Sequence, residues 1–332
     1  MAKKAICAVS AEAAIAKASS KSLDKWDKTW AYIFAFIPLA GFLIFSIAPI
    51  GLSLVAMFTN TDVNTFDSFK WNNFEGFRIV FDASYTRDTA IPVGDMFLQS
   101  IWITLWIAST QLVTLLIALI ISIVLSQKLK GSKVFQVLFF IPYICSSAAV
   151  AMMWKWVFDT DHGVLNSIFG SSIDFLGDPN IVTWCVIIAT IWSAPAYGIV
   201  MYRAAIGNIN SSLYEAADLD GANLFQKAWH VTIPGIAPTT FYLLMAGIST
   251  GLLTFDIANM IAQTGWGYDN IGGPGNMGLT LMRLVYYLQG DQVTMLNPAY
   301  LSAASVISWL LFIVTAALSA IVFVKRQRSL GK

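Results

Sequence analysis

The stretch Glu215-Ala216-Ala217-Asp218-Leu219-Asp220-Gly221, with Val231-Thr232-Ile233-Pro234 beyond it, forms the longest polar interruption in the second half of an otherwise apolar chain. It predicts two short helices that meet at a glycine. Ser211 or Ser212 is expected to cap the first helix, and Glu215 is placed to bond back or to favour the positive helix end. Gly221 ends that helix, because glycine adopts a left-handed turn at little cost.

A second short helix is expected over Ala222 to His230. Phe225 and Trp229 are four residues apart, so they lie on one face of it. Pro234 begins the next segment, where its missing N–H is tolerated. Taken alone, this stretch also fits an amphipathic helix that rests on a membrane surface.

The composition indicates a membrane protein. Of the 332 residues, 57% are hydrophobic and 12% are charged, against about 25% charged in an ordinary soluble domain. A membrane-spanning helix needs about 20 apolar residues. Six runs are long enough, and they predict an all-α membrane protein with spans at about 30–58, 96–126, 134–158, 181–206, 232–262 and 300–324.

The distribution of positive charge predicts the orientation of these spans. All but five of the 20 Lys and Arg residues fall on one side of the predicted membrane. They lie in the tail 1–29, the loop after the second span, the polar stretch 207–231 with Arg203 just before it, and the C-terminal end. Positive charge is retained in the cytoplasm, so both termini, including the tail 327–332, and the polar stretch are expected there. The five on the other side are Lys70, Arg78, Arg87, Lys155 and Arg283.

Several segments allow two interpretations. Lys17, Lys21 and Lys25 recur at four-residue steps, which fits a helix on the membrane surface or a disordered tail. The outer segment 59–95 carries aromatic residues that suit interfacial anchoring or a direct ligand role. Lys155 lies between two tryptophans, where it could snorkel to the interface or contact substrate.

The sequence contains no motif for catalysis or nucleotide binding. It has no G-x-x-x-x-G-K-[S/T] loop, no nucleophile elbow and no H-E-x-x-H. His162 and His230 have no second ligand at metal-binding spacing, so no metal site is expected. Asp256 is the one acidic residue well inside a predicted span. It faces a cavity or a partner, or it is a helix-end charge already in water.

The spacing of Glu215-Ala216-Ala217, Gly221 and Ile233-Pro234 resembles the EAA loop of the inner-membrane permease subunits of bacterial ABC importers. The resemblance covers about residues 30–326, which form the predicted permease domain. It is closest to the sugar-type branch, which includes permeases for maltose, related oligosaccharides and glycerol phosphate. The motifs that carry this are Trp71-Asn72-Asn73-Phe74, Phe139-Phe140-Ile141-Pro142-Tyr143, Trp154-x-Trp156-x-Phe158, Gly163-x-Leu165-Asn166, Phe255-Asp256-Ile257 and Gly272-Gly273-Pro274.

The resemblance implies a type I importer permease with six spans and a cytoplasmic coupling helix. It also implies an assembly with a second permease chain, two cytoplasmic ATPase subunits that bind ATP and Mg²⁺, and an external solute-binding protein. This chain would hold no cofactor and bind no nucleic acid, and it would lie in the cell membrane. The residues implied to dock on an ATPase are Glu215, Ala216, Ala217, Asp220, Gly221 and Ala222.

The cargo is expected to be a sugar, and sugar sites use aromatic faces and polar side chains. The candidates for the substrate pathway are Trp192, Tyr197, Asp256 and Asn259. The chain departs from the family pattern at Gln99-Ser100 and by an apparent insertion over 264–271. The alternative function is an ion-coupled secondary carrier that works without ATPase subunits, although such a carrier would be expected to use more intramembrane acids than Asp256.

Overall fold

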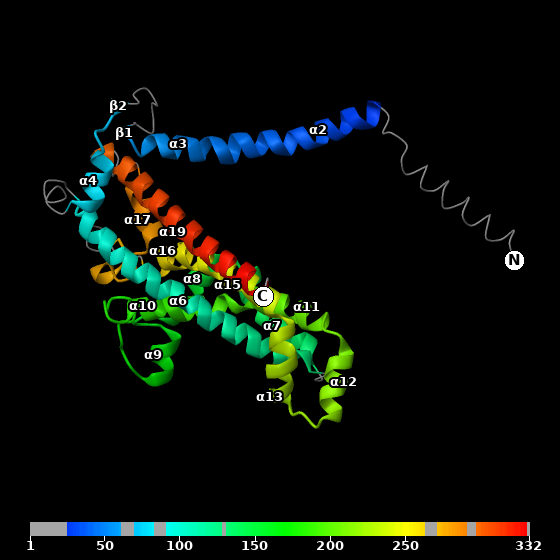
Figure 1. The fold of residues 1–332 in the computed structure, drawn as a ribbon. Coiled ribbons are helices and arrows are strands. Elements are labelled where there is room, and N and C mark those ends of the chain that lie inside the picture. The colour runs from blue at the N-terminus through cyan, green and yellow to red at the C-terminus, as the bar shows by residue number, and fades with distance from the viewer. Residues whose placement is uncertain are drawn as a thin grey trace. The chain divides into compact units, whose positions relative to one another are not determined.

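The computed structural model describes residues 25–60, 70–82, 91–127, 131–262, 271–290 and 297–330, most of them in helices (Figure 1). The chain forms two compact units, Met1–Val55 and Ala56–Lys332. The predictions for the tail 1–24, Arg87 and most of the insertion 264–271 lie outside the described residues. The expected helical membrane fold is confirmed, and the described chain adds one short antiparallel pair, β1 (Thr59–Asn60) and β2 (Lys70–Trp71).

The described part of the first unit is an apolar helix in three parts. These are α2 (Lys25–Phe42), the π-helix η1 (Leu43–Ile47) and α3 (Ala48–Ala56). Pro49 has no N–H to give to the carbonyl four residues earlier, so the helix is expected to distort at this point. It does so through η1, where the Ala48 N–H donates to the Leu43 carbonyl, five residues back.

The second unit contains most of the helices. In chain order they are α4 (Glu75–Phe81), α6 (Val93–Ser126), α7 (Ser132–Ile144), α8 (Ser147–Val157), α9 (Val164–Phe169), α10 (Val182–Ser193), α11 (Pro195–Gly207), α12 (Ser211–Leu219), α13 (Leu224–Lys227), η2 (Ala228–Thr232), α14 (Ile233–Gly235), α15 (Ala237–Leu252), α16 (Asp256–Ile261), η4 (Pro274–Asn276), α17 (Leu281–Leu288) and α19 (Ala299–Leu330).

Within the described residues, five helical stretches are long and apolar enough to cross a membrane: Thr29–Ala56, Val93–Ser126, Val182–Gly207, Ala237–Ile261 and Ala299–Gln327. A sixth is formed by α7 and α8 if this bent pair is one span. The last helix continues to Leu330, so the expected tail 327–332 is helical for most of its length.

The third expected span, 134–158, differs from the prediction of one helix. α7 and α8 meet at a bend of 97°. Pro142 lacks an N–H near the end of α7, and Ser146 starts a new helix by accepting a hydrogen bond of 3.2 Å from the Ala149 N–H. The fifth span is also interrupted, at residues 253–255 between α15 and α16.

The long helix α6 lies at the centre of the unit and packs against α10, α11, α15 and α17 (Figure 1). Glycine lets the helix backbones approach closely. A Cβ on Gly198 would lie 2.9 Å from the Ala118 Cβ, and one on Gly251 would lie 2.9 Å from the Gln111 Cγ. Small residues at such contacts are the usual way for helices to pack in a membrane, where lipid competes for apolar surface.

A buried polar contact within the second unit fixes the segment just before β1 and the start of α4 to the last helix. The Asn72 amide donates to the Ser302 hydroxyl over 2.8 Å, and Ser302 donates to the Met57 carbonyl over 2.8 Å. α4 begins directly after this contact and packs along α19. A Cβ on Gly76 would lie 2.2 Å from the Ser302 Oγ, so the two helices are as close as their backbones allow.

We predict that Gly76→Ala destabilises this unit. The added methyl group must displace α4 from α19, and overpacking of this kind costs about 1–3 kcal/mol. The measurement is the thermal unfolding midpoint of the chain in detergent. Gly51→Ala is the matched control, since a Cβ there meets nothing within 4 Å. Equal midpoints for the two variants would contradict the prediction.

Candidate functional site

The polar stretch between α11 and α15 folds as a compact helical loop (Figure 1). α12 is capped by Asn210, whose side-chain oxygen accepts a hydrogen bond of 3.1 Å from the Ser212 N–H. The prediction that Ser211 or Ser212 caps this helix is therefore wrong by one or two positions. Asparagine accepts the same bond as serine, and the helix begins at Ser211.

The left-handed turn at Gly221 is confirmed. Its φ is +71°. The Gly221 N–H donates to the Asp218 carbonyl over 3.1 Å, and the Ala222 N–H donates to the Ala217 carbonyl over 2.9 Å. These two bonds form a Schellman motif, which satisfies the last carbonyls of α12.

The second helix begins later than predicted and changes its winding. Asn223 caps α13 in a reciprocal capping box with Gln226, with bonds of 2.8 and 2.9 Å. After one α-helical turn the chain continues as the π-helix η2. The Phe225 and Trp229 rings stack with centroids 6.3 Å apart, so the expected shared face is confirmed.

Two side-chain contacts hold the halves of the loop together. The Tyr214 hydroxyl lies 3.0 Å from the Thr232 hydroxyl, which joins α12 to η2. The Lys227 ammonium pairs with the Asp218 carboxylate, which joins α13 to α12. A cavity of about 750 Å³ lies beneath the loop, and Glu215 and Arg203 are among the residues that line it.

The outer surface of the loop carries apolar side chains that the described residues leave uncovered. Leu219 is 91% exposed and Phe225 is 75% exposed. The predicted docking residues lie beside them: Glu215, Ala216, Asp220 and Gly221 are exposed, and Ala217 and Ala222 are half-buried. An exposed apolar surface with a polar rim is typical of a protein interaction site.

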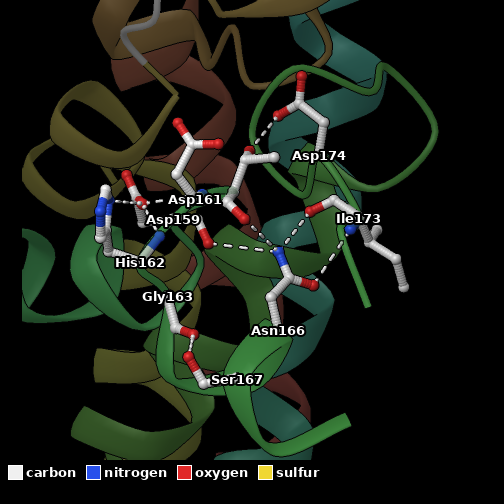
Figure 2. Close-up of polar contacts among 9 residues, drawn as sticks. Asp159, Asp161, His162, Gly163, Asn166, Ser167, Ile173 and Asp174 are labelled. Carbon is white, nitrogen blue, oxygen red and sulfur yellow. Dashed lines mark hydrogen bonds and ion pairs between the residues drawn. The ribbon is translucent and has the colours of Figure 1, made fainter. Parts of the chain in front are cut away.

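The segment between α8 and α10 is folded around Asn166, as Figure 2 shows. The buried Asn166 amide donates to the carbonyls of Asp159, Thr160 and Ile173 over 3.3, 3.1 and 2.9 Å. Its oxygen accepts from the Ile173 N–H over 3.1 Å. Asn166 belongs to the quoted Gly163-x-Leu165-Asn166 motif, and these contacts explain why an amide suits the position: it offers both donors and an acceptor.

Asp256 lies where the fifth span is interrupted, in the first turn of α16. Its side chain is exposed, and its Oδ2 accepts a hydrogen bond of 2.7 Å from the Ser147 hydroxyl at the start of α8. It is therefore a helix-end charge that also has a partner, so both interpretations offered by the sequence apply in part. The contact joins two interrupted spans at their breaks, and α8 and α16 pack together.

The other pathway candidates lie in different places. Tyr197 lines a cavity of about 320 Å³ that is also lined by Gln111, Tyr143 and Thr250. Trp192 lines a separate apolar cavity of about 590 Å³. Asn259 is half-buried on α16. The structure thus places Asp256 and Asn259 on one short helix and does not bring Trp192 and Tyr197 into one cavity.

Sequence analysis missed several neighbours of these residues. The Tyr197 hydroxyl lies 3.3 Å from the Tyr242 hydroxyl, and the Tyr143 ring stacks on the Tyr197 ring at 6.2 Å. The polar pair Ser146-Ser147, which begins four residues after Pro142 in an apolar run, was an available signal for the break and for the partner of Asp256. No comparable signal pointed to the pairing of Tyr242 with Tyr197.

Arg283, on α17, is a buried cation. It is 3% exposed, and its guanidinium donates to the Ala258 and Asn259 carbonyls of α16. Burial lowers the pKa of Arg283 to about 10, so the side chain is still charged at neutral pH. No carboxylate among the described residues pairs with it.

Membrane-length helices with interrupted spans and an exposed helical loop are features of a membrane permease. Residues 114–328 match the family described as binding-protein-dependent transport system inner membrane component, and the chain belongs to this family. It is therefore a multi-pass membrane protein and a transport subunit.

Similar proteins agree with this assignment. The chain is 28% identical over 311 residues to the "probable ABC transporter permease protein YesP" of Bacillus subtilis (strain 168). The aligned region covers 92% of this chain and 92% of YesP. It is 31% identical over 203 residues to the lactose transport system permease protein LacF of Rhizobium radiobacter, covering 59% of this chain and 64% of LacF. The recognition of a sugar-type ABC importer permease from the sequence is confirmed.

The fold is also similar to that of a solved bacterial alginate ABC transporter in complex with an alginate pentasaccharide-bound periplasmic protein. The TM-score is 0.69, the identity is 20%, and the match covers 91% of this chain and 96% of that chain. At this identity the likeness shows the fold alone.

We predict that Asp218→Asn loosens the loop between α11 and α15. Replacing the carboxylate removes the charge that holds Lys227, and an exposed ion pair of this kind accounts for about a two- to fivefold change in a local opening equilibrium. The measurement is the rate of tryptic cleavage after Lys227 in the detergent-solubilised chain. Asp220→Asn makes the same change at a residue with no described ion pair. Cleavage that is no faster in Asp218→Asn than in this control would contradict the prediction.

Proposed function

We propose that this chain is a permease subunit of an ATP-driven, binding-protein-dependent carbohydrate importer in the cell membrane. It forms half of the translocation pathway, and a second permease chain forms the other half. The observation that carries the proposal is the exposed, internally braced loop between α11 and α15, in a chain of the binding-protein-dependent family. Both termini and this loop face the cytoplasm, which the distribution of Lys and Arg supports.

The loop docks on one of two separate ATPase subunits, which bind ATP and Mg²⁺. Leu219 and Phe225 supply apolar surface for this contact, and Glu215 supplies a negative charge for a basic partner. Ala216 and Gly221 are small and exposed, so a partner can approach the backbone closely. ATP is hydrolysed on the ATPase subunit, and this chain transmits the resulting movement to its membrane-spanning helices.

The way in which the loop is attached explains how its displacement is transmitted to the membrane-spanning helices. Its first half continues directly from α11, and its second half leads through η2 and α14 into α15. Because Tyr214 and Lys227 join the two halves, a displacement of the loop moves both helices together. α11 and α15 both pack against α6, so the displacement reaches the centre of the unit.

The cargo is a carbohydrate or a related polyol. LacF is named for lactose, and the alginate transporter was solved with a pentasaccharide-bound partner. In this chain, Tyr143 and Tyr197 offer aromatic faces, and Asp256 offers an exposed carboxylate that can accept hydrogen bonds from sugar hydroxyls. An external binding protein selects the sugar first and delivers it.

The deciding experiment is uptake in proteoliposomes. The chain is purified with its second permease, ATPase subunits and binding protein, and uptake of radiolabelled lactose, an oligosaccharide and glycerol 3-phosphate is measured with and without ATP. We expect uptake only with ATP and binding protein. Uptake by the chain alone under a proton or sodium gradient would instead establish the ion-coupled carrier.

We predict that Gly221→Val uncouples ATP hydrolysis from uptake. Valine is strained in the left-handed conformation by about 1–2 kcal/mol, so the turn between α12 and α13 changes shape. The measurement is the ratio of sugar imported to ATP hydrolysed. Gly221→Asn is the matched control, because asparagine tolerates this conformation. Normal coupling in Gly221→Val would overturn the role assigned to the loop.

A further inference from the structure

Arg283 makes an unusual set of contacts for a buried cation. Its guanidinium Nη1 lies 3.2 Å from the Ala258 carbonyl and also donates to the Asn259 carbonyl. The Ala258 carbonyl already accepts from the Ala262 N–H, as in any helix. The last carbonyls of a helix have no partners within it, and they carry its negative end. Arg283 therefore acts as a C-terminal cap on α16 that is supplied from another helix.

The helix that carries Arg283 is fixed to the centre of the unit. The Leu281 N–H, at the start of α17, donates to the buried Thr104 hydroxyl of α6 over 2.9 Å. Thr280 caps α17 by accepting from the Arg283 N–H over 3.3 Å. The position of the guanidinium is thus set by α6, the helix against which α10, α11 and α15 also pack.

α17 contacts both ends of α16. Tyr286 lies three residues after Arg283, on the same side of α17. Its ring packs against Phe255, directly before α16, with centroids 5.1 Å apart. Arg283 binds carbonyls in the last turn of α16 and Tyr286 contacts the residue directly before its first turn, so α17 holds α16 at both ends although the span is broken just before it.

The braced helix presents Asp256 to Ser147 across the two breaks. We propose that Arg283 is a positioning residue for transport: it holds α16 on α17 and α6 so that Asp256 meets α8 at the substrate pathway. This rests on the proposed function, in which Asp256 contacts the sugar. The guanidinium of Arg283 donates to backbone carbonyls of α16 and is too buried to reach the cargo.

One further feature supports a role beyond packing. The Arg283 Nε is buried and has no hydrogen-bond partner among the described residues. A buried donor without an acceptor is costly, and an apolar side chain of similar size would avoid that cost. A guanidinium is needed if the role of Arg283 is to donate hydrogen bonds of fixed geometry to the last carbonyls of α16.

The test is a double-mutant cycle in the full transporter. Arg283→Met, Asp256→Asn and the double variant are compared by ATP-driven sugar uptake in proteoliposomes. If Arg283 acts through Asp256, we expect Arg283→Met to lower uptake by about tenfold or more alone and by less than about twofold when Asp256 is already replaced. Arg283→Lys keeps a cationic donor and is expected to restore part of the activity.

Geometry is measured separately from transport. In a chain whose native cysteines are replaced by alanine, Ser147→Cys and Asp256→Cys are joined by a short bifunctional thiol reagent in membranes. We expect Arg283→Met to slow this cross-link, and Arg78→Met, the same change at an exposed arginine, to leave it unchanged.

The outcomes distinguish the two proposals. Equal loss of uptake with and without Asp256, or an unchanged cross-link in Arg283→Met, would overturn the positioning role. If Asp256→Asn transports normally but Arg283→Met still slows the cross-link, the positioning of α16 stands and the assignment of Asp256 to the pathway fails. If the assembled wild-type complex shows no ATP-driven uptake, the importer proposal fails, and the cross-link alone decides the role of Arg283.

Discussion

The structure depends on one constraint: a helix that breaks inside a membrane leaves backbone groups that lipid cannot satisfy. In this chain the breaks are closed by short-range polar contacts. Ser146 caps the start of α8, and Ser193 donates to the Ala189 carbonyl over 3.0 Å just before α10 gives way to α11. Arg283, on α17, donates a hydrogen bond to the Asn259 carbonyl of α16. The breaks can persist because each has polar side chains beside it.

The same contacts explain why the short helices of this unit hold together. α8 and α16 are short, and a helix of six to eleven residues is marginal on its own. They are fixed by each other through Ser147 and Asp256, and by α17 through Arg283. The loop after α8 is in turn folded on Asn166. The family motifs supply two of these residues, and one of them, Asn166, hydrogen-bonds backbone groups, so part of the resemblance reflects the need to satisfy the backbone.

The fold was largely predictable from sequence because long apolar runs and the distribution of charge can be recognised along the chain without knowing how the helices pack. Five membrane-length helices, the glycine turn at Gly221 and the shared face of Phe225 and Trp229 follow from composition, spacing and propensity. The cap at Asn210 was misplaced because several neighbouring residues can cap a helix. The bend after Pro142 was not predicted, because a proline can also be accommodated by local distortion, as Pro49 is.

The candidate pathway was less predictable. Asp256 was marked by its charge in an apolar run, but its partner Ser147 lies 109 residues away. The Tyr197 and Tyr242 hydroxyls, and the pairing of Arg283 with α16, likewise join residues from different helices. Such contacts depend on how helices rotate and cross, which periodicity does not determine when the helices are apolar on all sides.

The placement of the breaks links the loop to the pathway. α11 runs from Ala194, where α10 ends, to the loop, and α15 runs from the loop to the break at residues 253–255. One of the two helices that hold the loop therefore ends at a break. Tyr197 on α11 and Tyr242 on α15 meet through their hydroxyls, so the helices are joined along their length as well as through the loop. If an ATPase displaces the loop, α11 and α15 are expected to move as one body against α6, and the geometry then changes most at the break after α15. This break lies directly before Asp256. A displacement of the loop would therefore move the proposed sugar contact without a change in the length of any helix.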